Sequence, residues 1–258
     1  MAISMKRGSQ HICKAWPKRL RLILWVFSAS NRMDRFERDV ESMAERLKRH
    51  YGREIWTRID EMRDRLINLH RSNRVKVNHS IMELVMGAYL ADKGYKVSLE
   101  HPLEDDLVAD IMAWRNGRSM IVEVETGFTS PENALDPQSY LTARAISKMA
   151  RYGVFADKFS LATPPHNILQ IPTILLKPKR RKDGLKLLKD LCDRYHQTPR
   201  IDLERLKAIK LHMIYIINVD TLKVKPLKPR TYLRLNKDLI PKLKDIKNYL
   251  RRPTFGAT

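Results

Sequence analysis

The stretch that decides the fold is VADIMAWRNGRSMIVEVETGF, residues Val108–Phe128. Two apolar runs, 107–114 and 119–126, flank Asn116-Gly117, which is a strong hairpin signal between strand-forming segments. We therefore expect the runs to pair as antiparallel strands. The same runs carry carboxylates that a strand buried only for packing does not need, namely Asp110, Glu123 and Glu125.

Side-chain alternation puts Ile121, Glu123 and Glu125 on one face of the second strand, with the two carboxylates about 7 Å apart along it. The hairpin can bring Asp110 beside them. Buried carboxylates repel one another unless a cation neutralises them, and oxygen-rich sites suit Mg²⁺ or Mn²⁺. The alternative is an edge strand with a solvated acidic face, but the apolar neighbours of Asp110 favour a central strand and a metal site.

The elements around this hairpin follow from apolar periodicity. Residues 80–95 predict an amphipathic helix and 95–100 a strand before the hairpin, while 136–152 predict a helix and 157–164 a strand after it. The resulting order is helix, three strands, helix, strand, which indicates a mixed α/β protein.

Asp110, twelve residues, and then Glu123-Val124-Glu125, within this order of elements, resemble the PD-(D/E)xK nuclease superfamily. Within it, VADI…NG…IVEVE is most similar to the central hairpin of archaeal Holliday-junction resolvases and RecB-like nucleases. The resemblance covers roughly residues 78–165 and implies a restriction-endonuclease-like core with a central mixed sheet in αβββαβ order. It also implies that Asp110 and Glu123 bind divalent metal, which activates a water for attack on a phosphodiester.

The resemblance also places Glu83, on the helix before the first strand, among the metal ligands. Another interpretation needs no metal, because Ser80-Ile81-Met82-Glu83 has the pattern of a capping box, in which the Glu side chain bonds back to the helix start. Both interpretations stay open on the sequence. His79, beside Ser80, is most simply a loop residue.

The family motif usually ends in lysine, and Glu125 stands at that position here. A third carboxylate can serve there as ligand or base, or the lysine can come from the next helix. Tyr140, Arg144, Lys148 and Tyr152 are spaced by four, so Lys148 can reach the carboxylates with Arg144 on a phosphate. The alternatives are that this row makes surface or DNA-backbone contacts, or that catalysis has been lost.

Residues 33–69 carry an apolar stripe with gaps of three and four, which indicates one long helix or a helical pair broken near Gly52. The stripe fits either a coiled-coil arm in a homodimer or a helix packed along its own domain. Residues 1–32 superficially resemble a secretory signal, but we favour a basic, poorly ordered extension or an upstream false start.

The last third predicts a buried strand at 211–220 with a short partner after it, and a basic helix within 236–252. We expect this part to complete the sheet and to contact DNA phosphates. Few aromatic residues interleave with its charges, so base stacking is not favoured there. The predicted phosphate contacts, beside Arg144, are Lys177, Lys179, Arg180, Arg181 and Lys182. The organisation is thus 1–32, a helical segment 33–73, a nuclease-like core 74–165 and a basic part 166–258.

The formal net charge of +21 is unevenly distributed. Residues 1–32 carry +7, residues 33–165 carry −1 and residues 166–258 carry +15. Two basic segments around a near-neutral middle favour a polyanion partner such as DNA over a merely solvated Lys-rich surface. The two cysteines match no disulfide or zinc spacing, and no apolar run is long enough to span a membrane, so we expect an intracellular (cytoplasmic) protein.

Taken together, these features predict a Mg²⁺- or Mn²⁺-dependent DNA endonuclease, which could be specific for a DNA structure in the manner of junction resolvases. The alternatives are a catalytically degenerate DNA-binding protein on a nuclease scaffold and a non-enzymatic structural or assembly protein.

Overall fold

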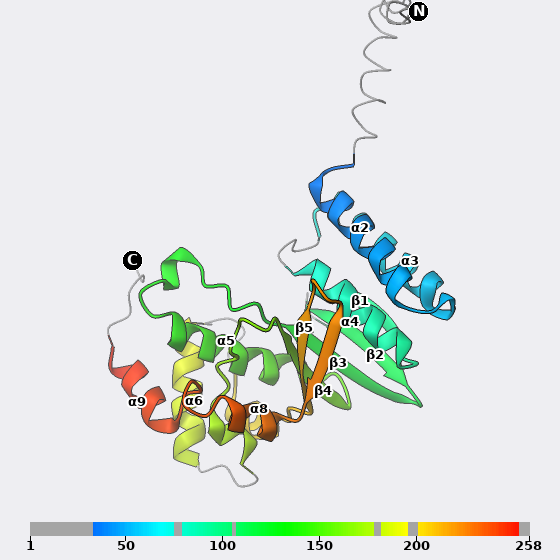
Figure 1. The fold of residues 1–258 in the computed structure, drawn as a ribbon. Helices are drawn as coiled ribbons and strands as arrows, with labels where there is room; N and C mark the ends of the chain where they lie inside the picture. Colours follow the sequence, from blue (N-terminus) through cyan, green and yellow to red (C-terminus); the bar gives the residue numbers. More distant parts are fainter. Residues whose placement is uncertain (1–32, 75–78, 105–106, 178–181, 196–200, 253–258) are drawn as a thin grey trace, which may run out of the picture. The chain divides into compact units, whose positions relative to one another are not determined.

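The computed structural model describes residues 33–74, 79–104, 107–177, 182–195 and 201–252 (Figure 1). The expected N-terminal extension 1–32 and the predicted phosphate contacts Lys179, Arg180 and Arg181 lie outside the described residues. The chain divides into two compact units, Met1–Asp39 and Val40–Thr258. Among the described residues, no helix is long and apolar enough to cross a membrane.

The centre of the larger unit is an open six-stranded sheet in the order β1-β2-β3-β4-β5-β6. Strands β1, β2 and β3 are antiparallel, β4 and β5 continue in parallel from β3, and β6 returns antiparallel. This mixed sheet with flanking helices confirms the α/β class. The bounds of the strands are Lys96–Pro102, Val108–Arg115, Arg118–Val124, Lys158–Thr163, Met213–Asn218 and Lys223–Leu227.

The β2–β3 hairpin turns at Asn116 and Gly117, whose φ angles are 53° and 71°. Positive φ at both central positions is what a two-residue hairpin turn of this twist requires, and Asn-Gly adopts it readily. Both strands lie in the interior of the sheet, and Glu123 is fully buried. The alternative of an edge strand with a solvated acidic face is therefore wrong.

The described residues form eight α-helices, numbered α2 to α9. Helices α4 and α5 match the predicted 80–95 and 136–152, so the order helix, three strands, helix, strand is confirmed. The strand predicted at 211–220 and its partner are β5 and β6. The short helices α7 and α8 had no clear signal. The bounds of α2 to α9 are Arg35–His50, Trp56–Arg71, Ser80–Asp92, Pro137–Tyr152, Lys182–Tyr195, Leu203–Ala208, Pro229–Leu235 and Leu243–Arg251.

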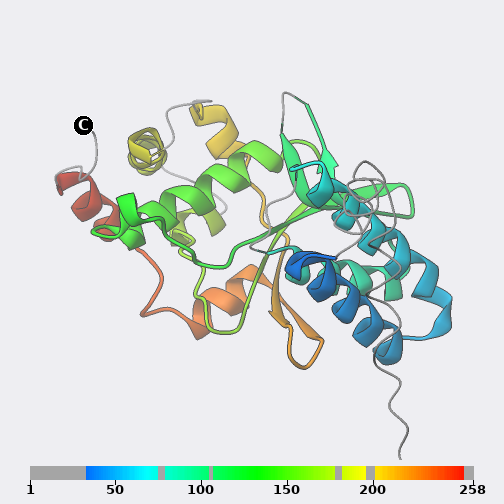
Figure 2. The same cartoon turned by 90° about the horizontal axis from the view of Figure 1, so that it is seen from above.

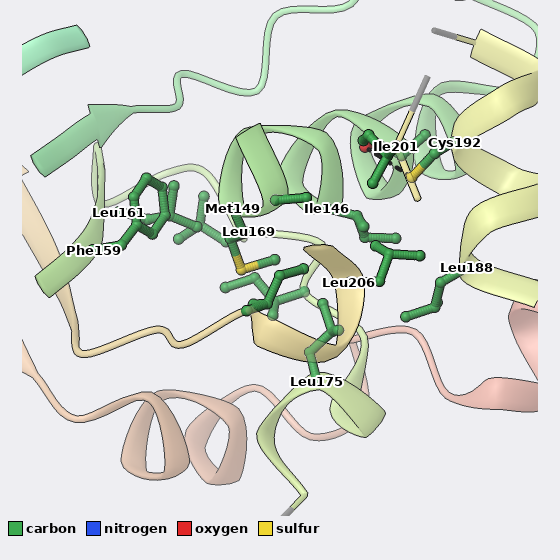
Figure 3. Packing of buried hydrophobic residues seen from close by; sticks show 14 of the residues in the cluster. Ile146, Met149, Phe159, Leu161, Leu169, Leu175, Leu188, Cys192, Ile201 and Leu206 are labelled. Atoms are coloured by element: carbon green, nitrogen blue, oxygen red, sulfur yellow. Dashed lines mark hydrogen bonds between the residues drawn. The ribbon is translucent and has the colours of Figure 1, made fainter. Parts of the chain in front are cut away.

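Each face of the sheet is covered by helices (Figures 1 and 2). Helices α5 and α6 pack on one face through a continuous apolar cluster, shown in Figure 3, to which β4 contributes Phe159 and Leu161. Helix α4 covers the other face, where the Tyr89 ring lies edge-on to Tyr215 of β5 with centroids 6.1 Å apart. Burial on both faces explains why the central strands are mostly apolar.

The apolar stripe of 33–69 forms a helical pair, α2 and α3, separated near Gly52 by the 3₁₀ turn Arg53–Ile55. Within the larger unit, the α2 residues of the stripe are buried inside the chain, and Lys48 pairs with Asp60 of α3 at 2.6 Å. This packing agrees with the alternative in which the stripe packs along its own domain. The homodimer stays a prediction.

Candidate functional site

Asp110 of β2 and Glu123 of β3 meet where the strand pairing ends. The backbone register runs as far as Ile111 opposite Val122. Beyond it, the Asp110 amide donates to Glu123 Oε1 at 3.1 Å, and the Val124 amide donates to Asp110 Oδ2 at 2.7 Å. The carboxylates accept hydrogen bonds that backbone carbonyls accept elsewhere in the sheet, so both side chains are fixed at the end of the ladder.

Helix α5 brings Lys148 into this cluster. Its Nζ lies 3.0 Å from Glu123 Oε2, 2.9 Å from Glu125 Oε1 and 3.4 Å from Asp110 Oδ2, and it donates to the Val124 carbonyl at 3.0 Å. A lysine of the following helix thus contacts all three carboxylates, including Glu125, the residue after Val124. One ammonium group serves three carboxylates, which is the compensation that buried acids need.

Arg144, one turn earlier on α5, is committed to protein groups. Its Nε lies 3.2 Å from Glu125 Oε2, and its Nη1 donates to the Phe128 carbonyl at 3.1 Å. The Glu125 side chain is therefore bracketed by Lys148 and Arg144. The phosphate contact expected of Arg144 stays a prediction, and it requires the guanidinium to share these bonds.

A second group of potential ligands adjoins the first. His79, Glu83, Glu100 and Asp110 each offer an atom, and these four atoms all lie within 4.8 Å of one another. His79 Nε2 lies 3.3 Å from Glu83 Oε1 and 3.5 Å from Asp110 Oδ1. Three carboxylates and one imidazole can hold a metal ion. Glu123, predicted as a ligand, lies beside this group but is not part of it, since its oxygens face the Asp110 amide and Lys148.

The surroundings of Glu83 indicate whether the four potential ligands fit a cation. Its side chain is fully buried, and neither carboxylate oxygen has a hydrogen bond among the described residues. Helix α4 begins at Ser80 with His79 as its N-cap and has no side-chain cap bond, so the capping-box interpretation of Glu83 is wrong. Buried oxygens left without donors are costly, and a bound cation would satisfy them.

Glu100 was not predicted as a ligand. Its backbone has a φ of 44°, in the left-handed region that side-chain-bearing residues rarely adopt, and the β1–β2 register passes over it. Arg65 of α3 holds this distortion: its Nη2 donates to the Glu100 carbonyl at 2.8 Å, and its Nε donates to the Leu99 carbonyl. Such local strain is often found at functional sites.

The burial and the charges of the cluster separate the pKa values of its acids. Burial raises the pKa of Glu83 well above its usual range, and the negative charge of Asp110 adds to this effect. Burial, with the same neighbour, raises the pKa of Glu123 to about 8. Burial also opposes ionisation of Asp110, but Lys148 and His79 outweigh it and hold the pKa of Asp110 well below its usual range. Acids with such different affinities for a proton are typical of catalytic sites.

Glu100, Asp110 and Glu123 line a cleft of about 590 Å³. Its walls carry basic side chains from two parts of the chain, and Asp110 and Glu123 are among its acidic residues. Lys177 and Lys182 are exposed but do not line this cleft, so their contacts with DNA stay predictions. The basic and aromatic residues of the lining are Arg74, His79, Arg144, Lys148, Arg151, Phe128, Tyr140 and Tyr152.

No protein-family model, curated protein or solved structure matches this chain. Two of the four potential metal ligands, His79 and Glu100, were not predicted as ligands from the sequence. His79 and Glu83 stand four apart at a helix start, a spacing that could have indicated a shared site. Glu100 gave no signal, because its approach to Asp110 depends on a backbone conformation that alternation along a strand does not predict.

Proposed function

We propose that this chain is a metal-dependent nuclease with a restriction-endonuclease-like core that hydrolyses phosphodiester bonds in DNA. The observation that carries the proposal is the position of Lys148, whose Nζ lies within 3.4 Å of Asp110, Glu123 and Glu125 and beside the four potential metal ligands. The sequence left open whether the site lacks its lysine, and the position of Lys148 supports the alternative in which the following helix provides it.

His79, Glu83, Glu100 and Asp110 would hold the metal. Carboxylate oxygens suit Mg²⁺ and Mn²⁺, and the imidazole is a softer donor, so we expect Mn²⁺ to bind at least as tightly as Mg²⁺. When bound, a divalent ion activates water and stabilises the charge that develops on a phosphoryl oxygen.

Lys148 has a defined role in this proposal. Burial works against its charge, but Asp110, Glu123 and Glu125 outweigh that effect and raise the pKa of Lys148 well above its usual value. The side chain therefore stays protonated at neutral pH. It can orient a water or stabilise negative charge, but the proton of the attacking water must go to another group. Glu123, whose pKa burial raises to about 8, is a neighbouring carboxyl that can accept it when ionised, so cleavage should increase as the pH rises toward 8.

The charge of the chain agrees with DNA as the substrate. Arg74 and Arg151 line the cleft and form no ion pair among the described residues, so they are available to phosphates. The net charge of +21 supplies a further electrostatic attraction, which should make binding strongly salt-dependent. Specificity for a junction and assembly as a homodimer remain part of this proposal as finer predictions.

Cleavage by the full-length chain is the direct test. Supercoiled plasmid, linear duplex and a four-way junction would be incubated with Mg²⁺, Mn²⁺ or EDTA, and products resolved on gels. We expect metal-dependent cutting that is lost in Asp110→Asn and Lys148→Met and retained in Glu61→Gln, which removes an exposed acid of α3. Tight, salt-sensitive binding without cutting of any substrate would replace the nuclease by a DNA-binding protein. If the protein neither binds nor cuts any of these DNA substrates, a DNA function is rejected.

A further inference from the structure

The cleft contains an exposed aromatic side chain that packing does not explain. Phe128 is 57% exposed, whereas Phe159 of the core is 1% exposed. Phe128 lines the same cleft as Asp110 and Lys148. Tyr140 and Tyr152, near the two ends of α5, also line it. A large exposed ring beside charged groups offers an accessible aromatic face on which a flat ligand can stack.

The backbone that carries Phe128 is held in place. Its carbonyl accepts a hydrogen bond from Arg144, and the Glu125 carbonyl accepts bonds from Thr163 at 2.8 Å and Asn167 at 3.1 Å. Gly127 has a φ of 78°, and a side chain there would collide with Asn167. The strand end and this loop are tied to β4 and α5, so the backbone that carries the ring is held at the wall of the cleft.

We propose that Phe128 is a stacking platform for an unpaired nucleobase next to the phosphate that is cut. This rests on the proposed nuclease function and names its substrate class: DNA with a single-stranded segment, as in a flap, a frayed end or an open branch. Bases in a continuous duplex expose only their edges in the grooves, so an aromatic face can reach a base only where the strand is unpaired.

The charges of the cleft agree with this substrate. Arg74 and Arg151 supply positive charge for the DNA phosphates, while Phe128 supplies an aromatic ring for a base. This combination of cations with an aromatic face is how proteins bind single strands without reading their sequence. The basic C-terminal third has few aromatic residues, so stacking was not favoured there. The cleft combines aromatic rings and basic side chains beside the carboxylates of the site.

The first experiment measures binding in EDTA, so that cleavage plays no part. Fluorescence anisotropy would compare a single strand of about 12 nucleotides with a blunt duplex of the same length. We expect Phe128→Ala and Phe128→Leu to weaken single-strand binding by roughly 5- to 100-fold and to change duplex binding by less than about twofold. Leu239→Ala is the matched control, because Leu239 is 59% exposed but does not line the cleft.

A second measurement reports stacking itself. In Phe128→Trp, the indole emission should be quenched by the single strand and much less by the duplex, whereas Leu239→Trp should respond equally weakly to both. Equal quenching by both ligands, or unchanged single-strand affinity in the Phe128 variants, would overturn the stacking role. If the stacking tests fail in this way but the Phe128 variants still cut DNA, the stacking inference is rejected and the nuclease proposal stands. If cutting is absent but selective quenching is seen, only the nuclease proposal fails, and absence of all binding rejects both.

Discussion

Lys148 Nζ lies 3.0 Å from Glu123 Oε2, so a buried contact between an ammonium and a carboxyl group joins helix α5 to strand β3. The same ammonium group also contacts Asp110 and Glu125. Removal of this positive charge would leave Asp110 and Glu123 without their ammonium partner and Glu125 with Arg144 alone, all with little access to water. The pair therefore links the stability of the protein to its proposed chemistry.

We expect Lys148→Met to lower the free energy of unfolding by about 3 kcal/mol in EDTA, because buried acids are left uncompensated. Denaturant titration followed by circular dichroism measures this directly. Arg151→Met, on the same helix and without an ion pair among the described residues, should change the free energy by less than about 0.5 kcal/mol. Equal effects of the two substitutions would contradict the account of Lys148.

The stability of the metal-free protein should fall as the pH rises from about 4.5 to about 8. The folded protein holds the proton of Glu123 with a pKa of about 8, above the ordinary value of 4.5, so it binds that proton more tightly than the unfolded chain does. This contribution is complete below the ordinary pKa and is lost as the pH approaches the raised one. The raised pKa of Glu83 acts in the same direction.

Unfolding free energies in EDTA at about pH 5 and about pH 8 test this expectation. Glu123→Gln should reduce the difference between the two values. If the wild-type protein becomes more stable over this interval while the variant stays unchanged, the assignment of a raised pKa to Glu123 is incorrect.

Metal binding should depend on both Asp110 and Glu83. Calorimetric titration with Mn²⁺ is expected to show binding that Asp110→Ala and Glu83→Gln abolish and Glu61→Gln retains. Excess Mn²⁺ at about a hundred times the dissociation constant should stabilise the wild-type protein by about 2.7 kcal/mol. Unaltered Mn²⁺ affinity in both site variants would remove the case for a metal here.

Without metal, Glu83→Gln should be more stable than the wild type, on the order of 1 kcal/mol, because it removes a buried acid that has no hydrogen bond among the described residues. Stability and metal binding would then change in opposite directions in one variant. A loss of stability in EDTA would show that Glu83 supports the fold by itself.

Arg65 should act on the site through the backbone. Because its guanidinium holds the carbonyls of Leu99 and Glu100, Arg65→Ala should weaken Mn²⁺ binding by roughly tenfold, as loss of a supporting group does at other metal sites. Arg58→Ala is the control: Arg58 also donates from α3 to backbone carbonyls, those of Ala91 and Tyr95, away from Glu100.

Arg65→Lys should restore part of the affinity, since an ammonium group can still donate to one carbonyl. If Arg58→Ala and Arg65→Ala weaken Mn²⁺ binding equally, the effect comes from general loosening of α3. A lower Mn²⁺ affinity only in Arg65→Ala would identify Arg65 as a positioning residue.

The sequence was most informative where local chemistry determines structure. The Asn-Gly turn and the alternation around Glu123 predicted the hairpin and the meeting of Asp110 with Glu123, because both depend on short-range rules. The spacing by four on 136–152 placed Lys148 and Arg144 on one helix face, but whether that face met the acids or the surface depended on packing between α5 and the sheet.

The residues that were missed depend on longer-range structure. Glu100 turns toward Asp110 because its backbone is left-handed and Arg65 holds it there, and neither feature is visible in the letters around it. His79 was taken for a loop residue because its partners, Glu83 and Asp110, come together only when α4 packs at the end of β2. The prediction of a capping box failed because the helix begins at Ser80 itself.

The two-residue turn at Asn116-Gly117 imposes a parity rule on this protein. Asp110 and Glu123 share a face of the sheet because the number of residues between them is even. Insertion or deletion of one residue within either strand would move one acid to the opposite face while leaving the apolar content almost unchanged. A change of two residues would bring both acids back to the same face. During evolution, length changes in this hairpin can therefore keep the fold and abolish the site in a single step.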